Sequence, residues 1–357
     1  MEKGTAETQL KETESVTRQY AVRPVHSKGQ GLVAMSKIRK GTRILAEAPI
    51  LKVPRHASDL QAVSSIIVKQ LRTLSRDQQT AFFELHNAHG KRHDPPLGIM
   101  KTNVPPLGSD SYEGGLFLTA SRINHSCRNN AQNTWNEKIG CITIHAVKDI
   151  EEGQEVPITY LGQAAPYAER QRSLRNKFFF DCKCELCSLP QVKREESDGR
   201  QQMIQDIDES IGSSAFGGGI EIGLKSVRVL LELLDQEGIT DTSIPRAYYD
   251  AFQIAIAHGD KARAKVFAER AYAARVIAEG DDSPETTKLK RLVKRPTEHL
   301  SIALAPLLPQ QPGKMARALI SGCGCKASHH RSAIPTKRQR QKMQDGLDTR
   351  TAKSLRF

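Results

Sequence analysis

The stretch RINHSCRNN, residues 122–130, places an Asn, a His, a Ser and a Cys side by side, with two more Asn and two Arg around them. Ile123 is the one aliphatic residue of the nine, so the stretch does not have the composition of an ordinary buried strand. It is either a polar turn or a functional site, and the rest of the chain has to decide between these two interpretations.

Length and composition limit the classes of protein that the chain can belong to. Its 357 residues are enough for about two domains, and 38% hydrophobic residues predict at least one buried core. A run of about 18 apolar residues, as a membrane-spanning helix needs, is absent, and residues 1–20 lack the apolar centre of a secretory signal. We therefore expect an intracellular protein of the nucleus or cytoplasm, with no membrane partner and with reduced cysteines.

The formal net charge is +13, and residues 323–357 contribute nine Lys or Arg against two Asp. Such a basic segment favours acidic partners such as nucleic acid or chromatin. A solvated end is an equally good interpretation, because no aromatic residue interleaves with these charges before Phe357. The run KRQRQK, residues 337–342, is typical of a nuclear import signal but also occurs by chance.

A cysteine-rich element carries the strongest chemical signal. Cys182, Cys184 and Cys187 place three thiols within six residues, which favours a metal site over three unrelated thiols on a turn. A closed structural zinc site uses four protein ligands, so one ligand must come from elsewhere in the chain. The residues alone leave this fourth ligand open among a His and four other cysteines, Cys127, Cys141, Cys323 and Cys325.

The pattern along the chain predicts an α+β protein. Short strands are expected at 19–25, 31–35, 43–51 and through 117–161, with two helices between 59 and 89 and a Pro- and Gly-rich loop at 94–115. Helices are expected near 168–180, 220–237, 245–258 and 261–278, the last ones resembling a helical-repeat domain. We predict a disordered N-terminus (1–18), a β-rich domain (19–161) with a helical insert (about 59–93), a cysteine-rich element (162–190), a charged Gly-rich linker (191–219), a helical domain (220–305) and a flexible basic tail (306–357).

Four motifs follow one another in a specific order: KGQGLVA (28–34), RINHSCRNN, GQEVPITY (153–160) and FDCKCELC (180–187). In this order they resemble the motifs of SET-domain protein-lysine methyltransferases, most closely the fungal SET proteins related to the SET-and-MYND group. The ligands of a MYND zinc finger are missing between Pro49 and Leu118. The resemblance spans about residues 19–190 and extends more weakly to about 300. It implies a SET fold, in which the NHSC segment threads through the loop of the fourth motif in a knot-like crossing, followed by a post-SET zinc element.

The resemblance also implies a cofactor and its ligands. S-adenosylmethionine is expected to contact Asn124 and His125 of the NHSC segment, with Phe180 near the adenine. Its methionine end is expected near Lys28, Gln30 and Gly31, and Asn103 is a further candidate contact. Cys127 becomes the expected fourth ligand of a structural zinc ion, beside Cys182, Cys184 and Cys187.

Tyr160, at the end of the GQEVPITY motif, matches the catalytic tyrosine of the family and is also expected to contact the cofactor. The implied reaction is methyl transfer to a lysine of a histone or another protein. The enzyme is expected to be a monomer and to associate with chromatin through its basic tail. One alternative is a catalytically weak SET-fold scaffold or chromatin-interaction module that keeps the zinc. Another is a zinc-dependent nucleic-acid binder, which ranks last because no reading helix follows the cysteines.

The chain departs from the family's pattern at three positions. Asn129 stands where Pro is usual, Gln154 where Glu is common, and Pro157 where Thr is typical. A Pro removes a hydrogen-bond donor from a strand, and Pro157 lies three residues before Tyr160. We therefore expect these departures to bear on activity rather than on the fold.

Overall fold

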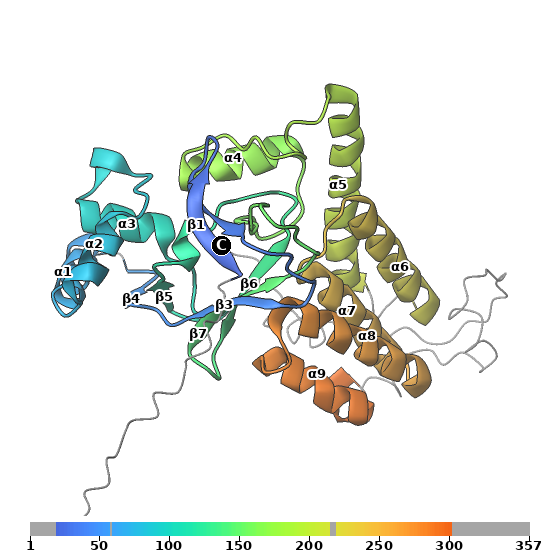
Figure 1. The fold of residues 1–357 in the computed structure, drawn as a ribbon. Helices are drawn as coiled ribbons and strands as arrows, with labels where there is room; N and C mark the ends of the chain where they lie inside the picture. The colour runs from blue at the N-terminus through green and yellow to red at the C-terminus, as the bar shows by residue number, and fades with distance from the viewer. Residues whose placement is uncertain (1–18, 58, 215–218, 302–357) are drawn as a thin grey trace, which may run out of the picture.

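The computed structural model describes residues 19–57, 59–214 and 219–301. A core of short strands lies in the middle, with helices α1 to α3 on one side and helices α5 to α9 on the other (Figure 1). Within the described residues, no helix has both the length and the apolar composition needed to cross a membrane. The expected disordered N-terminus, basic tail, Cys323 and Cys325 lie outside the described residues.

The strands form three small antiparallel sheets. β1 (Tyr20–Val25) pairs with β2 (Gly29–Ala34) around the turn at Ser27 and Lys28. The largest sheet has three strands in the order β3-β7-β6, and the third sheet pairs β4 with β5. The ranges of these strands are β3 Arg43–Glu47, β4 Leu51–Pro54, β5 Glu113–Leu116, β6 Ala131–Asn136 and β7 Cys141–Ala146.

Three expected strands differ from the structure. Residues 117–123, expected to form a strand, contain the short 3-10 helix Ala120–Arg122 instead. The strand expected over 43–51 is divided into β3 and the start of β4, because Pro49 between them cannot donate to a ladder. The expected strand at the end of GQEVPITY forms isolated bridges, Val33 with Glu155 and His125 with Ile158. This segment therefore bonds to β2 on one side and to the NHSC segment on the other.

The central strand β7 is buried on both faces and organises the β-core. Ile144, Ala146 and the neighbouring Ile150 have no exposed surface. Leu32 of β2 and Val156 of the GQEVPITY segment pack into the same cluster. This packing fixes the two segments that carry the candidate site.

The helical insert contains one helix more than expected. α1 (Leu60–Leu71) and α2 (Arg76–Phe83) match the two predicted helices, and Ser75 forms a capping box with Gln78 at the predicted break. The expected loop at 94–115 was wrong at its start, where α3 (Pro95–Asn103) forms. Prolines fit the first turn of a helix because its N–H groups have no partner within the helix.

The expected linker at 191–219 is also wrong over most of its length. α4 (Tyr167–Phe178) is followed by the 24-residue helix α5 (Gln191–Ser214). Charge does not break a helix: α5 buries Ile204 and Ile211 against α6 (Ile220–Gln236), while its charged side chains are exposed or half-buried. The Gly-rich run that suggested a linker begins only where α5 ends.

The C-terminal helices match the predicted segments. After α6 come α7 (Ser243–Ala257), α8 (Lys261–Glu279) and α9 (Pro284–Lys294). Small residues let α7 and α8 pack closely, since Ala255, Ala264 and Ala268 are fully buried. α8 also contacts β6 and β7, so the helical domain lies directly against the β-core.

Candidate active site and metal centre

The NHSC and GQEVPITY segments meet through backbone hydrogen bonds. The N–H of Ile158 donates to the carbonyl of Asn124 at 3.0 Å, and the N–H of Ser126 donates to the carbonyl of Ile158 at 3.0 Å. His125 and Ile158 thereby form a parallel bridge. This contact brings the backbone N–H of Tyr160 within hydrogen-bonding reach of the His125 side chain, 35 residues earlier in the sequence.

Four of the expected cofactor ligands lie in one polar network. The Asn124 side-chain amide donates to the carbonyl of Gln30 at 3.1 Å and to Glu155 at 2.9 Å, and the Lys28 ammonium lies 2.6 Å from Glu155. Gly31 allows this approach, because a Cβ atom there would lie 2.7 Å from the Asn124 amide nitrogen. The network offers a cation, a carboxylate and an amide, which suit the carboxylate and ammonium groups of an amino acid.

Glu155 was not among the residues expected from the sequence. It is the Glu of GQEVPITY, and its position in this motif could have identified it as a site residue. Asn103, by contrast, lies apart from the network. Its amide donates to the carbonyls of His86 at 2.7 Å and Ile99 at 2.8 Å, so both N–H groups are used within the insert.

His125 is 3% exposed and joins the polar network to the cysteines. Its Nδ1 accepts a hydrogen bond from the Tyr160 N–H at 3.0 Å, and its Nε2 lies 3.3 Å from Cys127 Sγ. Burial lowers the pKa of His125 to about 4, so the ring is neutral at pH 7. Because Nδ1 accepts, the ring proton resides on Nε2 and points to the sulfur.

The Tyr160 hydroxyl donates to the carbonyl of Ile123 at 2.5 Å. Burial, and then the charge of Glu155, raises the pKa of Tyr160, so the phenol stays protonated at neutral pH. The ring of Phe178, a residue not expected to take part, lies 4.8 Å from the Tyr160 ring. Phe180 lies 6.0 Å from the His125 ring. Aromatic rings thus enclose the tyrosine on the side of α4.

The four expected cysteines come together in one cluster. The sulfur atoms of Cys127, Cys182, Cys184 and Cys187 all lie within 4.8 Å of one another, with Cys127 3.6 Å from Cys187 and 4.0 Å from Cys182. A tetrahedral zinc ion with Zn–S bonds of 2.3 Å would hold its sulfurs about 3.8 Å apart. The four thiols are not paired as disulfides. Their geometry and chemistry therefore fit a closed zinc site.

Polar groups around the cluster hold it in place. The Gln171 side chain bonds both to the N–H of Cys182 at 3.0 Å and to its carbonyl at 2.8 Å. The buried Arg170 guanidinium lies 3.9 Å from Cys187 Sγ, where a cation stabilises thiolate charge. Cys141, one of the open alternatives, lies on β7 and donates to the Ile139 carbonyl instead.

The departures at Pro157 and Asn129 are accommodated in the fold. The N–H groups on both sides of Pro157 keep their partners, Val156 with Leu32 at 2.8 Å and Ile158 as described above. The Pro157 carbonyl accepts from the Ala131 N–H at 3.3 Å. The Asn129 amide is buried and donates to the Ala131 carbonyl at 2.9 Å. Tyr160 therefore follows a segment whose hydrogen bonds are made.

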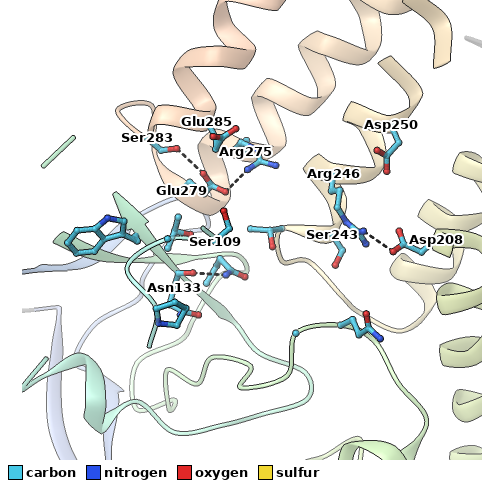
Figure 2. Close-up of a pocket in the computed structure, with 18 of the residues that line it drawn as sticks. Ser109, Asn133, Asp208, Ser243, Arg246, Asp250, Arg275, Glu279, Ser283 and Glu285 are labelled. Carbon is cyan, nitrogen blue, oxygen red and sulfur yellow. Dashed lines mark hydrogen bonds and ion pairs between the residues drawn. The ribbon is translucent and has the colours of Figure 1, made fainter. Parts of the chain in front are cut away.

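A cavity of about 1180 Å³ lies between the β-core and the helical domain (Figure 2). Gly162, two residues after Tyr160, is one of the residues that line it. Its lining holds seven carboxylates and three cationic side chains. Arg246 pairs with Asp208 at 2.8 Å and Arg275 with Glu279 at 2.8 Å. The cavity is thus acidic in a chain whose net charge is +13.

Comparisons with known proteins identify relatives of this chain. Residues 29–161 match the model of the SET domain. The histone-lysine N-methyltransferase set5 of Schizosaccharomyces pombe is 34% identical over 82% of this chain and 89% of its own length. The histone-lysine N-methyltransferase SMYD3 of Homo sapiens is 32% identical over 27% of this chain and 22% of its own.

A solved structure of the SET domain of LSMT, bound to lysine and AdoHcy, aligns over 79% of this chain and 88% of that chain, at 14% identity and a TM-score of 0.32. The similarity to set5 extends over 294 residues. The chain therefore belongs to the SET-domain family of protein-lysine methyltransferases.

Proposed function

We propose that this protein transfers the methyl group of S-adenosylmethionine to the side-chain amine of a lysine in a protein substrate. The observation that carries the proposal is the convergence of Tyr160, His125, Asn124 and Glu155 where the NHSC and GQEVPITY segments meet, with Lys28 reaching Glu155 from the β1–β2 turn. The relatives are named as histone-lysine methyltransferases, so a histone is the first substrate to test.

Finer features of the family belong to the same proposal. The bridge between His125 and Ile158 supports a knot-like crossing of the two segments. The cysteine cluster supports a post-SET element with one structural zinc ion, held by Cys127, Cys182, Cys184 and Cys187. The consecutive helices α6 to α9 support a repeat-like domain. The proposal also keeps a monomeric protein of the nucleus or cytoplasm, whose basic segment 306–357 would associate with chromatin.

When bound, S-adenosylmethionine supplies an electrophilic methyl group on a cationic sulfur. We assign the recognition of its amino-acid end to Lys28, Gln30, Gly31 and Asn124, with Glu155 added. Phe180 and His125 would line the adenine side. Asn103 was a candidate cofactor contact. Because both N–H groups of its amide donate to backbone carbonyls, we assign it a structural role in the insert.

Tyr160 would orient the reacting groups and would not act as a base. Its raised pKa keeps the phenol protonated, and its hydrogen bond to Ile123 fixes the hydroxyl oxygen. That oxygen offers lone pairs for weak C–H···O contacts with the methyl group. A lysine amine has a pKa of about 10.4, and an apolar channel lowers it by disfavouring the ammonium form. Orientation and desolvation would then supply most of the rate.

The substrate's backbone needs a surface near Tyr160, and we assign this role to the acidic cavity that Gly162 lines. Carboxylates outnumber cations in the lining even though Asp250 is partly protonated at pH 7, and this charge attracts a lysine-rich segment. Complementary charge of this kind favours selection of partners and fast encounter.

The test is methyl transfer from labelled S-adenosylmethionine to core histones and to a cell extract, read by mass spectrometry. Tyr160→Phe should keep the fold and lower turnover about a hundredfold, since misplacement of reacting groups by about 1 Å has this effect. Tyr112→Phe is the matched control, because Tyr112 is 81% exposed. Cofactor binding without any transfer by the unaltered protein would instead support the scaffold interpretation.

A further inference from the structure

Three consecutive phenylalanines end α4, and their backbone turns each ring to a different partner. Phe178 lies against Tyr160, Phe180 against His125, and Phe179 between them points to the helical insert. Phe179 has a φ of 59°, in the left-handed region. This position after a helix is usually occupied by Gly, because a large side chain is strained there.

The ring of Phe179 is held between two side chains of the insert. The Arg92 guanidinium lies over the ring at 4.4 Å from its centroid, and the His89 ring meets it edge-on at 5.1 Å. Burial, and then the charge of Lys101, lowers the pKa of His89, so a neutral ring makes this contact at pH 7. Phe179 is nevertheless 42% exposed, so core packing does not account for a bulky residue in this conformation.

The strain therefore accompanies a specific contact between two parts of the protein. The insert begins about 120 residues before Phe179, and Phe179 joins it to the segment that leads into the cysteine cluster. A Gly at this position would keep the backbone turn and lose the contact. The large aromatic side chain is therefore explained by its contact with Arg92 and His89.

We propose that Phe179 is a positioning residue, which latches the helical insert onto the end of α4 and thereby fixes Phe178 and Phe180 beside Tyr160 and His125. The proposal rests on the proposed function, since the fixed rings would line the cofactor site. Arg92 is its partner in the insert. The expected consequence is on cofactor binding more than on the stability of the fold.

Phe179→Gly separates the two roles. It relieves the backbone strain, so the midpoint of urea unfolding should stay the same or rise. The KM for S-adenosylmethionine should rise about three- to tenfold, since a cation–π contact has an energy of this size, while kcat changes less. Phe179→Tyr should restore the KM, and Arg92→Ala should raise it as Phe179→Gly does. Phe83→Ala is the matched control, because Phe83 is an insert phenylalanine with 54% exposure.

Hydrogen exchange tests the latch without reference to activity. The Arg92 N–H bonds to the His89 carbonyl at 3.1 Å in the short helix of residues 90–92. Its exchange should be faster in Phe179→Gly and unchanged in Phe83→Ala. An active enzyme in which Phe179→Gly changes neither this exchange nor the KM would overturn the latch. If the unaltered protein neither binds the cofactor nor transfers methyl, the proposed function fails, and unchanged exchange would then remove the latch as well.

Discussion

The Nε atom of Arg128 donates a hydrogen bond to the backbone carbonyl of Glu237 at 3.1 Å. Arg128 follows the cluster residue Cys127 directly, and Glu237 lies at the end of α6. The same guanidinium reaches Glu185, between two further cysteines of the cluster, at 3.4 Å. One side chain thus joins the NHSC segment, the cysteine-rich element and the helical domain, which makes the helical domain part of the site's support.

Glu237→Gln should weaken the contact between α6 and α5 that supports this junction. The Glu237 carboxylate is fully buried and accepts from Ser197 at 2.6 Å, from Gln201 at 3.0 Å and from Arg200. Burial opposes it, but these hydrogen bonds hold the pKa of Glu237 below its ordinary value. Losing the charge should lower the free energy of unfolding by roughly 1–3 kcal/mol, measured in urea at pH 7.

Glu185→Gln provides the comparison for that junction, because the Glu185 side chain is 79% exposed. It should change stability by less than about 0.5 kcal/mol. Equal effects of the two substitutions would show that burial of Glu237 has no special importance.

Cys184→Ser should release the metal. The purified protein is expected to carry about one zinc ion per chain, and the variant close to none, since a closed site needs all four ligands. Loss of the ion should also lower thermal stability, because metal binding is coupled to folding of the element. Cys141→Ser, outside the cluster, should keep its zinc. Metal analysis that finds no zinc in the unaltered protein would rule out the metal centre.

Gly31→Ala should displace Asn124. The added Cβ would lie 2.7 Å from the Asn124 amide nitrogen and 2.7 Å from a methyl carbon of Val25, so one of them must move. Calorimetry should show S-adenosylmethionine binding weakened about tenfold or more, as expected when a binding group is misplaced. Gly199→Ala on α5 is the matched control, because its Cβ meets nothing within 4 Å. Equal cofactor affinity in the two variants would remove Gly31 from the binding site.

Asp250 predicts a dependence of stability on pH. Burial raises its pKa from 3.8 to about 7; Arg246 on the same helix opposes this shift and Asp208 on α5 adds to it. Because the folded state holds the proton more tightly, the stability contribution of Asp250 is lost as the pH rises from about 4 through 7. Asp250→Asn should therefore be more stable than the unaltered chain at pH 8, with little difference at pH 4.

Unfolding measured in urea at both pH values tests this, with Asp235→Asn, at an exposed position, as the control. An Asp250→Asn variant that is as stable as the control variant at pH 8 would show that Asp250 ionises normally.

Much of the fold could be predicted from local patterns. Apolar spacing and the capping residues Asp59 and Ser75 mark the helices of the insert, and the four ordered motifs indicate the family. The errors were also local. Prolines at the start of α3 were interpreted as a loop, and charged residues on α5 as a linker, because sequence alone does not reveal which face of a helix will be covered.

The sequence by itself determined the identity of the motifs and three members of the cysteine cluster, because these three lie within six residues. The residues alone left the fourth ligand open, and only the packing of the NHSC segment places Cys127 beside Cys182, 55 residues away. Tertiary structure also decided the contacts of Glu155, Phe178 and Phe179. Each depends on a partner from a distant segment, and such contacts follow from how the whole chain packs rather than from any local spacing.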